Sequence, residues 1–162
     1  MPTPHPWTTH ERAHLDAIAA RMQTVADRFT PDQWDRPIRQ GWTTKQMLAH
    51  LAFWTETTQP VVRTMLRGGN ELPADRWYGG DDLGLGPNDP WPDADTHNTR
   101  EAAWAAHRTP QAVIDRWTHA HRQLNDLIAS VTPQEATSEI GAYLTQSREH
   151  TQHHLTELEA ID

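Results

Sequence analysis

The sequence contains no cysteine. This absence excludes disulfide bonds, thiolate zinc fingers and a cysteine nucleophile. Basic runs are also missing, and the net charge is −8 when histidine is counted as neutral. Nucleic acid and anionic membrane surfaces attract basic proteins, so neither is an expected partner. We expect a small-molecule partner instead.

Long apolar stretches are missing as well. No stretch approaches the roughly 20 residues that a membrane-spanning helix needs. The N-terminal stretch MPTPHPWTTHERAH lacks the basic and apolar regions of a signal peptide. We therefore expect a cytoplasmic protein, either a monomer or a homodimer. The 162 residues suffice for one domain with a real core, which we place at residues 8–162 after an irregular lead-in at residues 1–7.

Apolar residues recur at steps of three and four along much of the chain, which is the period of a helix, and strand-like alternation is absent. Four long amphipathic helices are predicted, and they define an all-α protein with a four-helix bundle. The residues expected on the buried stripes are Leu15, Ile18, Met22, Val25 and Phe29; Met47, Leu48, Leu51 and Trp54; Val113, Trp117, Ala120, Leu124, Leu127, Ile128 and Val131; and Ile140, Tyr143, Leu144, Ser147, His150, Thr151, His154 and Leu158.

Capping signals predict where the helices begin. A capping box with Thr8 as N-cap and Glu11 reaching back should start the first helix. The second should start at Thr43 or Thr44, and another should follow the N-cap Thr109. Helical patterns are also expected over residues 95–107 and about 138–160.

The second helix should kink or end at Pro60, or extend to a glycine stop at residues 68–69. Between 68 and about 94 the chain holds six glycines and four prolines, which predicts a long irregular loop between the second and third main helices. Loops of this length are more often functional than idle. Its aromatic residues, together with the one on the preceding helix, are expected either to line a substrate pocket or simply to pack: Trp54, Trp77, Tyr78 and Trp91.

The stretch SREHTQHHLTEL, residues 147–158, belongs to a chain with eleven histidines. His150 and His154 are four apart and therefore share one helix face, whereas a rival pair, His10 and His14, lies in a solvated helix start. His50 falls on a buried stripe of the second helix. Three imidazoles and an open position form a catalytic zinc site, and imidazole also suits nickel, iron and cobalt. The alternative is hydrogen-bonded core histidines. Surface positions are expected for His5, His97, His107, His119 and His121.

Two stretches, GWTTKQMLAHLAFW at 41–54 and EHTQHHL at 149–155, resemble the DinB/YfiT-like superfamily of bacterial four-helix-bundle metalloproteins. The resemblance covers nearly the whole chain. It implies that one histidine of the second helix joins two histidines of the last helix to bind a divalent metal ion, zinc or nickel before iron or cobalt. The matching positions are His50, His150 and His154.

Between Trp42 and Trp54 the sequence is most similar to the ClbS/DfsB branch of that superfamily. This resemblance implies a detoxification or self-resistance enzyme that hydrolyses a small electrophile through a metal-bound water. Other branches use low-molecular-weight thiols, as in the mycothiol-dependent maleylpyruvate isomerases and bacillithiol S-transferases. A thiol-dependent transferase or isomerase is therefore the alternative enzyme, with the thiol as cosubstrate. A non-catalytic protein that sequesters a small molecule is the alternative outside enzymes.

Two further residues are candidates for catalytic roles. Tyr143 is seven residues before His150 and so lies on the same stripe about two turns away, where it would donate to an oxyanion or simply pack. Glu157 follows His154 by three residues and would accept from its distal N–H. The alternative for Glu157 is a solvated carboxylate.

Overall fold

The computed structural model describes residues 6–38, 41–68 and 94–162. Its helices are α1 (Pro6–Arg28), α2 (Pro31–Trp34), α3 (Thr44–Leu66), α4 (Ala94–Ala106), α5 (Pro110–Ala129) and α6 (Ser138–Glu159). No strand occurs within these described ranges. The predicted all-α fold is therefore confirmed.

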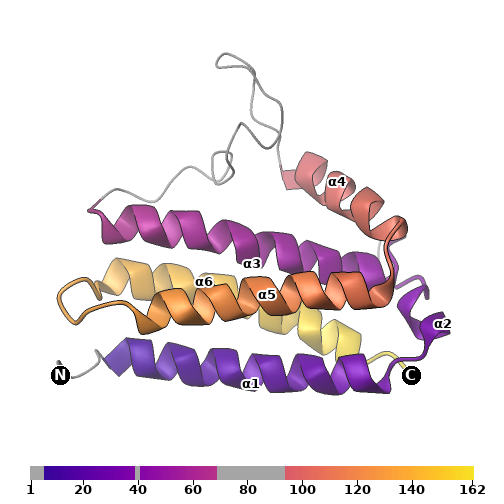
Figure 1. Ribbon diagram of the computed structural model, residues 1–162, viewed down its shortest axis with the longest axis horizontal. Coiled ribbons are helices and arrows are strands. Elements are labelled where there is room, and N and C mark those ends of the chain that lie inside the picture. The colour runs from indigo at the N-terminus through magenta and orange to yellow at the C-terminus, as the bar shows by residue number, and fades with distance from the viewer. Residues whose placement is uncertain (1–5, 39–40, 69–93) are drawn as a thin grey trace, which may run out of the picture.

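The four long helices α1, α3, α5 and α6 lie side by side and form the bundle (Figure 1). The short helix α2 follows α1 at one end. Helix α4 packs mainly against α3, on the outer side of the bundle (Figure 1). None of the described helices is long and apolar enough to cross a bilayer.

Side-chain caps start α3 and α5 where the sequence predicts them. The Thr43 hydroxyl accepts from the Gln46 backbone N–H at 3.2 Å, and the Gln46 side chain accepts from the Thr43 N–H at 2.8 Å, which completes a capping box. At α5 the Thr109 hydroxyl accepts from the Ala112 backbone N–H at 3.2 Å, and Pro110 occupies the first position of the helix. The predicted starts of α3 and α5 are confirmed.

The predicted start of α1 is wrong. The helix begins at Pro6, so Thr8 lies inside it and is buried rather than acting as a cap. Trp7 packs on the apolar cluster at this end of the bundle and holds the first turn in place. Glu11 does not reach back, because its carboxylate pairs with Arg148 of α6 at 3.0 Å.

Pro60 does not end α3, which continues to Leu66. The proline itself is exposed, but Val61 and Val62 directly after it are completely buried. Their packing holds the helix together past the residue that lacks an N–H. The chain then leaves the helix at Gly68, which has a φ of 79°, a backbone conformation that glycine adopts at no steric cost.

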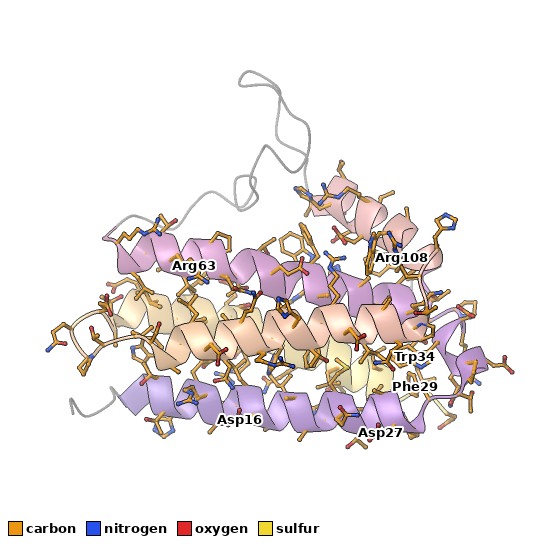
Figure 2. The ribbon with its side chains drawn as sticks, in the orientation of Figure 1. Asp16, Asp27, Phe29, Trp34, Arg63 and Arg108 are labelled. Atoms are coloured by element: carbon orange, nitrogen blue, oxygen red, sulfur yellow. The ribbon has the colours of Figure 1, made fainter. Side chains whose placement is uncertain are left out.

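The core consists of two apolar clusters, one toward each end of the bundle. Phe29 and Trp34 close one end, with ring centroids 5.0 Å apart, and lie together in Figure 2. Asp16 and Asp27 of α1 lie outside its buried stripe and are exposed (Figure 2). Most of the predicted stripe positions are buried, which is where apolar side chains contribute most to stability, about 1.5–3 kcal/mol each.

Candidate metal centre

The structure brings His50 of α3 together with His150 and His154 of α6. His50 follows Met47 and Leu48, whose burial turns this side of α3 toward the bundle. His150 and His154 are one helical turn apart and face it. The Nε2 atoms of His50 and His150 are 3.2 Å apart. One ring nitrogen from each of the three lies within 4.8 Å of the other two.

The three rings also contact one another as rings. Their centroids are 5.1 Å apart for His50 and His150, 5.0 Å for His50 and His154, and 4.8 Å for His150 and His154. They form part of the wall of a cavity of about 310 Å³. The remaining lining residues are Trp42, Met47, Asn98 and His153. The imidazoles therefore converge on open space, where a further ligand can enter.

Asn98 of α4 fixes the tautomer of His50. Its side-chain oxygen lies 3.0 Å from His50 Nδ1 and 3.0 Å from the indole nitrogen of Trp54. An amide oxygen only accepts, so the short contact between Asn98 and His50 requires the proton on Nδ1 of His50. The Trp54 N–H, whose nitrogen also lies 3.2 Å from that Nδ1, then donates to the Asn98 oxygen. The Nε2 lone pair of His50 is then free to face the other histidines, as in metal sites whose ligands are held by outer partners.

Glu157 fixes the tautomer of His154 in the same way. Its carboxylate accepts from His154 Nδ1 at 2.6 Å, which leaves Nε2 as the free ring nitrogen. The same carboxylate lies 3.8 Å from His153, whose side chain is largely exposed. Carboxylates in this position orient an imidazole ligand and increase its basicity.

Burial keeps two of the three imidazoles neutral. It lowers the pKa of His50 to about 3, helped by the neighbouring His150 and His154 and opposed by the hydrogen bond to Asn98. Burial likewise lowers the pKa of His150 to about 4, with His154 and His153 adding repulsion. Both rings are therefore uncharged near pH 7, which is the form that binds a metal ion.

The residues present fit a divalent ion. Two nitrogens bound to one tetrahedral ion at about 2.0–2.1 Å lie about 3.3 Å apart. The observed 3.2 Å between the Nε2 atoms of His50 and His150 matches this spacing. Three imidazole nitrogens beside an open cavity can hold zinc or nickel, and iron(II) or cobalt also accept such a set.

The other predicted site residues are placed differently. Trp54 lies beside His50 and donates its N–H to the Asn98 oxygen, but it does not line the cavity. Tyr143 is buried in the apolar cluster with Val61 and Ile140 and does not line it either. The remaining predictions, for Trp77, Tyr78 and Trp91, fall outside the described residues.

Two histidines expected at the surface are buried, and those expectations are wrong. His97 is 5% exposed and stacks on Phe53 with centroids 5.1 Å apart. His121 is 6% exposed, stacks on Trp117 at 4.7 Å and donates from Nε2 to the Leu15 carbonyl at 2.8 Å. The partner of His97 lies on another helix, α3. Trp117 lies one turn before His121 on α5 itself, and the carbonyl that accepts from His121 belongs to α1. The expected exposure of His10, His14, His107 and His119 agrees with the structure.

Sequence reasoning missed two residues of the centre. Asn98 lies in a polar helix without an apolar stripe, so no periodicity marked it. His153 lines the cavity although it is exposed. Trp42, noted only as part of a motif, has its ring 5.2 Å from that of His50. The signal for Asn98 is its contact with α3, which only the packing of α4 reveals.

Fold and site together define a helical-bundle protein whose clustered histidines can hold a metal ion. Residues 15–160 match the mycothiol maleylpyruvate isomerase N-terminal domain family, and the chain therefore belongs to that family. This family is part of the DinB/YfiT-like superfamily, so that resemblance is confirmed. The match does not extend to the ClbS/DfsB branch. Comparison with curated proteins and with solved structures gave no match.

Proposed function

We propose that this protein is a divalent-metal-dependent enzyme that uses a low-molecular-weight thiol, of the mycothiol type, to isomerise or conjugate a small electrophile. The observation that carries the metal is the convergence of His50, His150 and His154 on one open cavity. Membership of the mycothiol maleylpyruvate isomerase N-terminal domain family supports the thiol.

Within this proposal each residue has a stated task. His50, His150 and His154 hold the ion, while Asn98 and Glu157 keep the first and the last of these rings in orientation. A divalent ion, zinc or nickel before iron or cobalt, would act as a Lewis acid that favours the thiolate form of a thiol near neutral pH.

The protein does not supply the sulfur, because the sequence has no cysteine. A thiol cosubstrate must therefore enter the cavity, which holds about 310 Å³. No carboxylate is among the described residues that line it. A dication held by three neutral imidazoles keeps its positive charge there, which favours an anionic thiolate over a neutral ligand.

The family match favours this thiol-dependent reaction over the hydrolysis that the ClbS/DfsB resemblance implies. Both reactions would use the same three histidines. Hydrolysis of an electrophile and non-catalytic sequestration are therefore the outcomes from which the experiment must separate thiol-dependent turnover.

The test uses protein loaded with zinc or nickel and maleylpyruvate as the electrophile, with and without mycothiol. Turnover that requires the thiol and is lost in His50→Ala supports the proposal. Turnover without thiol would establish a hydrolase instead, and stoichiometric binding without turnover would establish a sequestering protein. His10→Ala is the matched control, because His10 has the same i,i+4 spacing to a second histidine but is exposed. A second electrophile, bearing a leaving group, distinguishes transfer from isomerisation.

A further inference from the structure

Helix α4 forms a wall of the histidine cavity while standing outside the bundle. It packs on α3, and its buried residues are mostly small or polar: His97, Glu101, Ala102 and Ala105. Beyond the stacking of His97 on Phe53, polar contacts tie it down. The Gln46 side chain donates to the Ala102 carbonyl at 3.1 Å, and Lys45 donates to the Arg108 carbonyl just after the helix at 2.9 Å. These directional contacts fix its position together with the packing of Ala105 and Trp104 on the apolar cluster.

The strongest of these contacts comes from Arg116 of α5. Its Nε and Nη2 donate to the two carboxylate oxygens of Glu56 on α3 at 2.7 and 2.8 Å. Its Nη1 donates to Glu101 of α4 at 2.6 Å. Its guanidinium also lies 4.6 Å from the ring centroid of Trp104. One planar side chain thus joins three helices, a geometry that arginine provides and lysine does not.

This clamp is close to the residue that orients His50. Glu101 follows Asn98 by three residues, so the two side chains are neighbours on one face of α4. Glu101 is 6% exposed on its side chain and Arg116 is 19% exposed, so the pair is shielded from water. A shift of α4 along α3 would move both Glu101 and Asn98.

From this geometry we infer that Arg116 is a positioning residue of the histidine centre: by fixing Glu101 it holds α4 where Asn98 can accept from His50 Nδ1. Arg116 does not line the cavity and touches neither metal ligand nor substrate. It acts through a rigid helix, and its effect on the centre passes through one hydrogen bond. The inference rests on the proposed metal site for its main readout.

The first measurement is the affinity for Co²⁺, by competition with a chelator, together with the Co²⁺ absorption bands. Asn98→Ala should weaken binding by about 10–100-fold, the usual loss for an outer partner of a ligand. Asn98→Asp, which keeps an acceptor oxygen, should restore most of it. Arg116→Met should weaken binding and alter the bands, and Glu101→Gln should do so in the same direction.

The double variant Asn98→Ala/Arg116→Met separates positioning from a general structural role. If Arg116 acts through Asn98, adding Arg116→Met to Asn98→Ala should change the affinity by less than about 2-fold, because the two changes remove one interaction. Losses that multiply in the double variant would overturn the inference. If Arg116→Met does not fold, the double variant Asn98→Ala/Glu101→Gln provides the same comparison.

Arg21→Met is the matched control. Arg21 also makes a two-bond contact to a carboxylate, Glu159, at 2.8 and 2.7 Å, but it joins α1 to α6 and leaves α4 untouched. Its Co²⁺ affinity and bands should equal those of the unchanged protein. An Arg116→Met variant that behaves like Arg21→Met would overturn the inference.

A metal-free readout makes the two proposals separable. In ¹⁵N spectra of metal-free protein at pH 7.5, His50 should carry its proton on Nδ1, and Arg116→Met or Glu101→Gln should shift it toward a mixture of tautomers. Unchanged His50 signals in both variants would overturn the positioning role. Failure of the unchanged protein to bind any metal would refute the proposed function alone, and the tautomer measurement would still decide the role of Arg116.

Discussion

His50 and His121 are buried to the same extent, 6% exposed each, but their surroundings differ. His121 donates from Nε2 to the Leu15 carbonyl and stacks on Trp117. His50 has Asn98 on Nδ1, and its Nε2 faces a ring nitrogen of His150. Burial of an imidazole is therefore a poor indicator of a ligand. The informative feature is a ring nitrogen that faces other ring nitrogens and open space.

The largest expected effect is the loss of the bound metal ion when a ligand histidine is replaced. Protein purified without chelator should carry close to one divalent ion per chain, and His50→Ala or His154→Ala should lose most of it. The loss in affinity should exceed the about 10–100-fold that an outer partner provides. Metal analysis of the purified variants measures this. The metal content of His121→Ala, His10→Ala and His153→Ala should stay unchanged, and an equal loss in His10→Ala would mean that the other pair binds the ion.

Acid should weaken the metal-free fold through the histidine cluster. The folded pKa values of His50 and His150 are lowered to about 3 and about 4, against about 6.5 in an unfolded chain. The stability that depends on neutral rings is therefore present above pH 6.5 and is lost as the pH falls toward 4. The free energy of unfolding should drop by about 5 kcal/mol between pH 7.5 and 4.5.

Urea unfolding at several pH values, with chelator present, measures this drop. His50→Ala should show roughly half of it, because one of the two rings is gone. An unchanged pH dependence in that variant would contradict the lowered pKa of His50. With metal bound, the ion should be released steeply below pH 6.5, since proton and metal compete for the same nitrogens.

The same comparison predicts a stability effect at His121. His121→Ala removes a buried stacked ring and its hydrogen bond to Leu15, so the free energy of unfolding should fall by about 3 kcal/mol. Urea unfolding in chelator checks the magnitude. Co²⁺ affinity measured alongside should be unaffected, and a large loss of affinity would show that the two regions are not independent.

The smallest expected effect concerns Glu157. Glu157→Gln keeps a hydrogen-bonding side chain beside His154 but removes its charge, so Co²⁺ affinity should fall by about 10-fold. Glu149→Gln, an exposed change on the same helix, is the control and should have no effect. Equal Co²⁺ affinities for the two variants would mean that Glu157 is only a solvated carboxylate.

Much of the fold followed from local patterns. The stripe of α5 and its start after Thr109 were predictable because caps and the 3.6-residue period involve neighbours in sequence. The start of α1 was not predictable from local patterns. Trp7 packs on a cluster made mostly by residues far from it in the sequence, and Glu11 pairs with Arg148, 137 residues away. Pro60 likewise remained inside α3 for reasons of packing.

For the candidate site, the sequence by itself placed His150 and His154 on one helix face and His50 on a buried stripe. It gave His10 and His14 the same spacing, and local geometry cannot distinguish the two pairs. Tertiary structure decided that His50 meets His150 across 100 residues, and that α4 carries Asn98 to the same point. Helical hydrogen bonds join residues four apart and can be read locally. A site shared by three helices depends on how their faces pack, which no single stretch of sequence contains.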